Sequence, residues 1–77
     1  ELPTHFYMSK KVDNVRIFND IKKLVDEIVQ HLTQVKGASV EVSLDVNVNA
    51  PNGIPQDVVR TVNENCMTLK VDDKGFD

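Results

Sequence analysis

The chain has 77 residues, a formal net charge of −3 and a single cysteine. A chain this short forms one small domain, which buries only about 60% of its unfolded surface. One cysteine excludes an internal disulfide, and no apolar run approaches the ~18 residues of a membrane-spanning helix. We therefore expect a single cytoplasmic domain without membrane contact.

The chain starts with Glu1 rather than with methionine, and it ends at Asp77. Processing or removal of a tag would explain this start, and so would our expectation that residues 1–77 are one domain excised from a larger protein.

Residues 5–10 alternate in character, with Phe6 and Met8 on one side and Tyr7 and Ser9 on the other. Such alternation predicts a short strand. Asp13 or Asn14 then offers a side-chain oxygen that is suited to capping a helix.

Residues 15–35 show the periodicity of an amphipathic helix. The apolar side chains fall within about 140° of a helical wheel that advances about 100° per residue. Gly37 is well placed as the left-handed residue at the C-terminal end of this helix. The apolar positions are Ile17, Phe18, Ile21, Leu24, Val25, Ile28, Val29, Leu32 and Val35. Three pairs of opposite charge are spaced four apart, namely Arg16 and Asp20, Lys22 and Asp26, and Lys23 and Glu27.

Residues 39–49 alternate strictly between apolar and polar side chains. Successive side chains of a strand point to opposite faces, so this pattern predicts a long central strand with one buried face and one polar face. The apolar set is Val40, Val42, Leu44, Val46 and Val48, and the polar set is Glu41, Ser43, Asp45 and Asn47.

The composition of residues 50–53 predicts a turn, and Pro55 suits the first position of a second helix. Asn63 and its neighbours weaken the helical propensity, so we expect this helix to end there. Residues 67–71 alternate again and predict a third strand, in which Lys70 would protect an edge. The apolar side of the second helix would carry Val58, Val59, Val62 and Cys66.

The predicted order is strand, helix, strand, helix, strand. The predicted fold class is therefore an α+β or α/β two-layer sandwich of βαβαβ order, with about three strands and both helices on one sheet face. The open face would present Glu41, Ser43, Asp45 and Asn47 either to solvent or to another domain.

The sequence predicts no catalytic, cofactor-binding or metal-binding residues. No glycine-rich phosphate loop is present, and three or four convergent metal ligands are not evident from one cysteine and two histidines. Cys66 falls on an apolar helix side and is expected to be a buried small hydrophobe. His5 and His31 are expected to be a strand-start residue and a boundary residue, respectively.

Nucleic-acid binding is disfavoured by the charge. Affinity for nucleic acids comes largely from neutralised phosphates, and here the adjacent basic residues form only two short pairs, Lys10-Lys11 and Lys22-Lys23. Acidic residues follow both pairs closely.

The segment from Pro51 to Lys70 resembles the C-terminal end of large prokaryotic ATPases built around domain of unknown function 499. The resemblance lies in a Pro-x-Gly-x-Pro turn followed by three further motifs, which are Val58-Val59-Arg60-Thr61-Val62, Glu64-Asn65-Cys66 and Thr68-Leu69-Lys70. These ATPases are associated with defence against phage and foreign DNA. The resemblance implies that a nucleotide site would lie upstream, outside this chain.

Two functions are compatible with these features. The first is a non-catalytic accessory module that needs no cofactor and docks onto the rest of a parent ATPase or onto another protein. It would use the polar sheet face or the Arg60, Thr61, Glu64 and Lys70 segment. The alternative is a nucleic-acid-contacting module of the same protein that uses Arg60, Lys70 and the Lys10-Lys11 pair. A third hypothesis, a small cysteine enzyme, would depend on Cys66.

Overall fold

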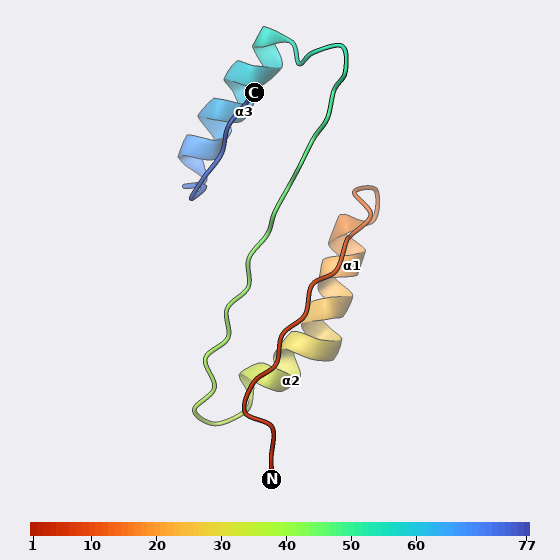
Figure 1. Ribbon diagram of the computed structural model, residues 1–77, viewed down its shortest axis with the longest axis vertical. Helices are drawn as coiled ribbons and strands as arrows, with labels where there is room; N and C mark the ends of the chain where they lie inside the picture. Colours follow the sequence, from red (N-terminus) through yellow and green to blue (C-terminus); the bar gives the residue numbers. More distant parts are fainter. The chain divides into compact units, whose positions relative to one another are not determined.

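The computed structural model describes all residues 1–77, and it contains helices but no strand (Figure 1). The elements are α1 (Ile17–Leu24), the π-helical segment η1 (Val25–Val29), α2 (Gln30–Thr33) and α3 (Gln56–Thr68). The chain divides into an N-terminal unit, Glu1–Ser43, and a C-terminal unit, Leu44–Asp77. The expectation that residues 1–77 form a single domain stays a prediction.

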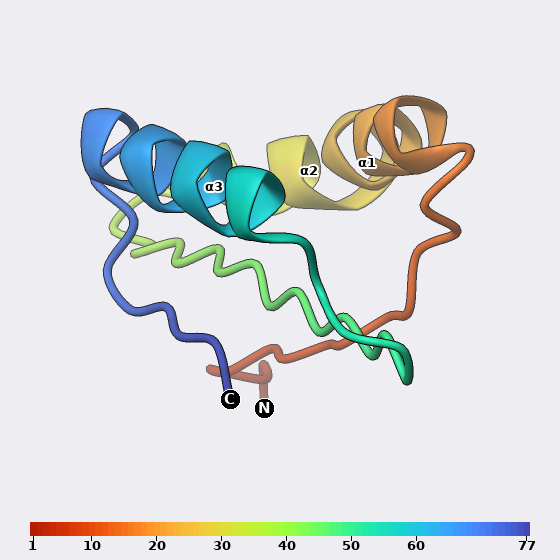
Figure 2. The ribbon, with the colours of Figure 1, turned by 90° about the horizontal axis from the view of Figure 1, so that it is seen from above.

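The elements α1, η1 and α2 follow one another without a break and are drawn as one coil in Figure 2. We call this coil the first helix. At about 1.5 Å per residue it is roughly 26 Å long. The helix predicted for residues 15–35 is therefore confirmed, although it begins at Ile17 and ends at Thr33. Its half-buried apolar side chains recur at spacings of three and four and are Ile17, Leu24, Ile28, Val29 and Leu32.

The middle of the first helix is a π turn of five residues, Val25–Val29. The Gln30 N–H donates to the Val25 carbonyl, five positions back, instead of to the residue four positions back. A π turn inserts one residue into the repeat, so the two halves of the apolar stripe are offset from the ideal wheel. Such single π turns are rare and occur frequently at functional sites.

The start of the first helix follows an Asp13 turn. The Asp13 carboxylate accepts a hydrogen bond from the Val15 N–H over 2.9 Å, and the Asp13 carbonyl accepts one from the Arg16 N–H over 3.0 Å. Asp13 is thus the capping residue of the predicted pair, but it acts just before the helix. The N-cap position itself is held by Arg16, which makes no side-chain capping bond.

The first helix ends in a turn over residues 35–38, closed by a bond from the Ala38 N–H to the Val35 carbonyl over 3.1 Å. Gly37 has a φ of +82° in this turn, a geometry that L-residues with a Cβ rarely adopt. The left-handed glycine is therefore confirmed, but it belongs to the turn after the helix and not to the helix end.

The helix α3 begins after Pro55 and has 13 residues. Pro55 is its N-cap rather than its first helical residue, with φ of −58° and ψ of 149°. The predicted turn over residues 50–53 is confirmed by the Gly53 N–H, which donates to the Ala50 carbonyl over 2.8 Å.

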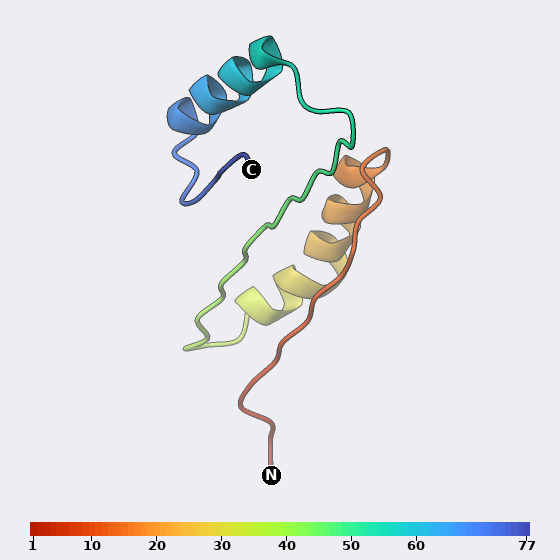
Figure 3. The ribbon, with the colours of Figure 1, turned by 45° about the horizontal axis from the view of Figure 1, so that its top comes forward.

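The C-terminal end of α3 has a complete Schellman motif. The Val71 N–H donates to the Cys66 carbonyl over 3.0 Å, and the Lys70 N–H donates to the Met67 carbonyl over 3.2 Å. Lys70 takes the left-handed position with a φ of +56°, where glycine is the usual residue. The chain then turns back (Figure 3), and the Lys74 ammonium donates to the Asn63 side-chain oxygen over 2.8 Å.

The predicted α/β sandwich is wrong, because none of its three strands forms. Residues 5–10 and 39–49 carry neither helix nor strand, and Met67 and Thr68 lie in the last turn of α3. Alternation defines two faces, but a strand forms only where a second backbone satisfies its N–H and C=O groups. Asn63 and Asn65 do not end α3, since helix propensity is a weak prior that caps and local bonds override.

No side chain in the chain is buried. Val42, with 74% of its surface exposed, and Val46, with 72%, lie on the side of the central run that was expected to pack under the helices. The expected buried face is therefore open to solvent. No helix of the structure combines the length and apolar character that crossing a membrane requires.

Candidate functional site

The residues Arg60, Thr61 and Glu64 all lie exposed on α3. At about 100° per residue they span an arc of roughly 100°, opposite the arc that holds Val58, Val59, Val62 and Cys66. We call Arg60, Thr61 and Glu64 the α3 polar face. The structure thus brings together on one side of a helix three of the residues that the sequence predicted for interaction.

Arg60 and Glu64 are four apart but form no ion pair. The Glu64 backbone carbonyl instead accepts a hydrogen bond from the Thr68 hydroxyl over 3.1 Å. The α3 polar face therefore offers one free guanidinium and one free carboxylate to whatever contacts it.

Lys70, the fourth predicted residue of this segment, lies after the helix and outside the polar face. Its left-handed backbone conformation and its N–H bond to Met67 give it a structural role in ending α3. The prediction that Lys70 protects the edge of a strand is wrong, because residues 69–71 form a helix cap.

The other predicted interaction residues, Glu41, Ser43, Asp45 and Asn47, lie in a stretch without regular structure and are all exposed. Their side chains make no hydrogen bond or ion pair with the chain. The apolar residues between them are exposed as well. The proposed polar sheet face is therefore wrong, because both sides of this run face solvent and no sheet exists.

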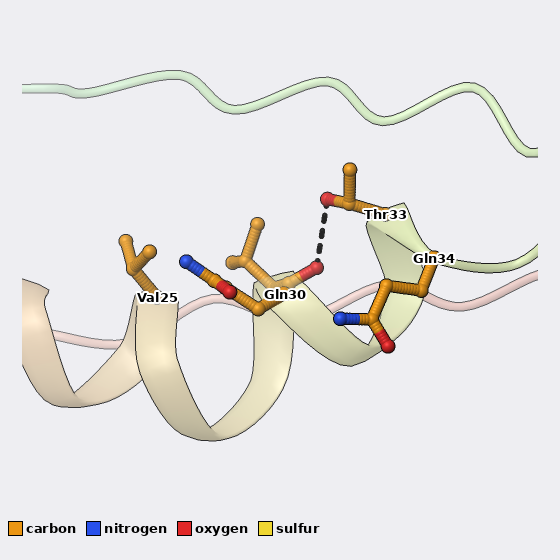
Figure 4. Close-up of a pocket in the computed structure, with 5 residues that line it drawn as sticks. Val25, Gln30, Thr33 and Gln34 are labelled. Carbon is orange, nitrogen blue, oxygen red and sulfur yellow. Dashed lines mark hydrogen bonds between the residues drawn. The ribbon is translucent and has the colours of Figure 1, made fainter.

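A shallow hollow of about 340 Å³ lies beside the π turn (Figure 4). Val25 and Val29 line it together with the amide side chains of Gln30 and Gln34. The fifth lining residue, Thr33, donates its hydroxyl hydrogen bond to the Val29 carbonyl over 2.9 Å. Sequence reasoning missed this hollow, since a helical wheel assumes an unbroken repeat and carries no signal for a π turn.

One predicted charge pair of the first helix is formed, between Lys22 and Asp26. The hydrogen bond from Lys22 to the Asp26 carboxylate, with the attraction between their charges, raises the pKa of the Lys22 ammonium above its ordinary value of 10.5. The pairs of Arg16 with Asp20 and of Lys23 with Glu27 are not formed.

The nucleophile and base candidates are not assembled within either unit. Cys66 is half-buried in the last turns of α3 and is a free thiol, rather than the fully buried hydrophobe that we expected. Both histidines belong to the N-terminal unit, where His31 is exposed on α2 and the His5 ring stacks on Tyr7 at 6.0 Å between centroids. No group of three or more His, Cys, Asp or Glu side chains is placed to hold a metal ion.

Comparisons of the chain with family models, with curated proteins and with solved structures found no match. They give no support to the resemblance to the ATPase family, which stays a prediction from the residues between Pro51 and Lys70.

Proposed function

We propose that this chain is a non-catalytic interaction module that completes its apolar packing against another protein. The single observation behind this proposal is that no side chain of the chain is buried. The partner that we propose is the rest of a larger ATPase-type protein, which would act in the prokaryotic cytoplasm in defence against foreign DNA.

Helix physics supports the need for a partner. Most helical stability in proteins comes from packing an amphipathic face rather than from the isolated helix. The first helix has such a face, yet Phe18 is 89% exposed, and Ile21 and Val25 are also exposed. Burying Phe18 against a partner would contribute about 1.5–3 kcal/mol, and Ile21 and Val25, which are already more than half covered, would each contribute less.

The two helices suit different kinds of contact. Protein interfaces combine apolar and polar contacts, and the stripe of the first helix is apolar while the α3 polar face is charged. We assign the stripe to an apolar contact of the N-terminal unit, and Arg60 with Glu64 to a separate polar contact of the C-terminal unit. The identity of the partner as an ATPase rests only on the resemblance of residues 51–70.

Site-specific photo-crosslinking in the native host tests this assignment. A benzophenone amino acid is placed at Phe18, on the apolar stripe, and in a matched variant at Lys23, on the opposite side of the same helix. We expect the Phe18 probe to give adducts with peptides of a protein that contains a glycine-rich phosphate loop, and the Lys23 probe to give few. Equal labelling from both probes, or Phe18 adducts without any such protein, would contradict the proposal.

Titrating the chain with duplex DNA at two salt concentrations distinguishes the alternative, a nucleic-acid-contacting module, from the proposed protein-interaction module. Phosphate contacts give an affinity that falls steeply as salt rises. We expect no binding at moderate salt, in keeping with the net charge of −3. A steep salt slope that disappears in an Arg60→Ala variant would favour the alternative.

A further inference from the structure

The run over residues 40–48 combines unpaired backbone groups with exposed apolar side chains. No backbone N–H or C=O group of residues 39–49 takes part in a backbone hydrogen bond. Its five apolar side chains are all exposed. Unpaired backbone with alternating side chains is a template for pairing with another strand.

The order of residues in this run is nearly symmetric about Leu44. If a second copy is laid antiparallel with Leu44 opposite Leu44, every apolar residue meets an apolar residue and every polar residue meets a polar one. The opposed pairs are Val40 with Val48, Glu41 with Asn47, Val42 with Val46, and Ser43 with Asp45.

Charge selects this arrangement over its competitors, because like charges directly opposite each other on paired strands are destabilising. A parallel pairing in register places Glu41 against Glu41 and Asp45 against Asp45. Two neighbouring antiparallel registers also keep the apolar side chains on one side. One places Glu41 opposite Asp45, and the other places Asp45 opposite Asp45 of the second copy. In the pairing centred on Leu44, each carboxylate instead faces Ser43 or Asn47, whose hydroxyl and amide can donate hydrogen bonds.

We propose that residues 40–48 pair antiparallel with the same residues of a second copy of this chain, around a two-fold axis at Leu44. The interface is isologous, as in most homodimers. It uses residues that the proposed function does not use. The failure of one proposal would therefore leave the other unaffected. A two-stranded ribbon is marginal by itself, and we therefore expect a dimer that dissociates on dilution.

Disulfide trapping tests the pairing directly. Val40→Cys and Val48→Cys are made separately in a Cys66→Ala background, one chain is labelled with ¹⁵N, and the mixture is oxidised with oxidised glutathione. We expect the mixed disulfide between positions 40 and 48 to make up clearly more than the half of all disulfides that random pairing of equal amounts of the two chains would give. A chain with Asp72→Cys in the same background measures the rate of random collisions. A statistical mixture, an excess of identical-chain disulfides, or trapping no faster than this control would overturn the proposal.

Charge variants test the register by sedimentation equilibrium. Ser43→Asp places a second carboxylate opposite Asp45, and Ser43→Lys places an ammonium there. Because the two-fold axis repeats each change, we expect the dimer dissociation constant to rise by about two- to thirtyfold in the first variant and to fall by a similar factor in the second. Ser39→Lys, which faces uncharged Asn49, is the matched control. A chain that is monomeric at every concentration, or Ser43 variants that match the control, would contradict a homodimer and leave pairing only with a different protein.

Discussion

The first helix and α3 are both amphipathic, but their ends and their interiors are specified in different ways. The helix α3 is bounded by local chemistry, with Pro55 as its N-cap and the Schellman motif around Lys70 at its other end. Neither Pro55 nor Arg16 makes a side-chain capping bond, but the first helix ends in the turn around Gly37 and contains a π turn in its middle. The two helices therefore differ at their C-terminal ends and in the π turn, and not at their N-caps.

The two helices differ in how much stability each has to obtain by packing against other residues or another protein. Residues near α3 already hold its ends and attach its return segment, through the bond from Lys74 to Asn63. In the first helix the polar interactions of the side chains are the Lys22–Asp26 pair and the Thr33 hydroxyl bond, and both are exposed. The apolar stripe of the first helix can therefore stabilise it only when another surface covers it, and in this chain Phe18, Ile21 and Val25 are exposed.

The largest expected effect is the loss of α3 in a Thr61→Pro variant. Proline in a helix interior removes a backbone bond and clashes with the preceding turn, at a cost of about 3 kcal/mol. We expect the helical Cα chemical shifts of residues 56–68 to collapse over much of α3. Thr4→Pro, outside any helix, is the control. Helical shifts that persist on both sides of position 61 would contradict the described extent of α3.

A Gly37→Ala variant tests the end of the first helix. A Cβ at this position meets no atom within 4 Å, so the cost comes only from the positive φ of +82°, which is about 1–2 kcal/mol for an L-residue. We expect the 35–38 turn to open and the helical shifts of Leu32 and Thr33 to weaken. Gly75→Ala, where φ is not left-handed, is the matched control. An unchanged turn would mean that Gly37 does not hold the left-handed conformation in solution.

A Lys70→Gly variant makes the reverse change at the end of α3. Glycine adopts a φ of +56° without the Cβ penalty, so we expect the last turn of α3 to gain up to about 1 kcal/mol. Slower amide exchange of the Lys70 and Val71 N–H groups would measure this gain. Lys11→Gly, which lies outside α3 at a residue without a side-chain hydrogen bond, controls for the loss of a lysine. A faster exchange at Val71 in Lys70→Gly would contradict the Schellman motif.

The smallest effect is the pH dependence of the first helix. The folded pKa of Lys22 is raised above 10.5 by Asp26, so its contribution to stability is complete below that pH and is lost as the pH rises through the raised value. We expect helicity of residues 17–33 to fall slightly in this range. The fall should vanish in Lys22→Met and persist in Lys23→Met. The same loss in both variants would show that the Lys22–Asp26 pair is not its cause.

The parts of the fold that were predictable are those decided within a few residues. Spacings of three and four located both helices, and the composition of residues 50–53 located a turn that the Gly53 bond confirms. The end of α3 was misplaced, because Asn63 and Asn65 are poor helix formers, whereas the Thr68 hydroxyl bond and the Lys70 cap lie beyond them.

The candidate surfaces also differ in whether they depend on local or on long-range contacts. The α3 polar face followed from the helical period, and Arg60, Thr61 and Glu64 lie together as expected. The hollow at the π turn was not predictable, because a helical wheel does not anticipate the bond from Gln30 to Val25 that spans five positions. The predicted polar sheet face does not form, because it required strands from distant parts of the chain to pair with one another.

The amino-acid sequence by itself therefore determined which segments are helical, where the turns lie and which side of each helix is apolar. Helix bonds join residues only four or five positions apart, so the information that they need is local. Only the tertiary structure decided that residues 5–10, 39–49 and 67–71 build no sheet. A strand is completed by the backbone of a distant segment or of another molecule, and alternation alone cannot supply that second backbone.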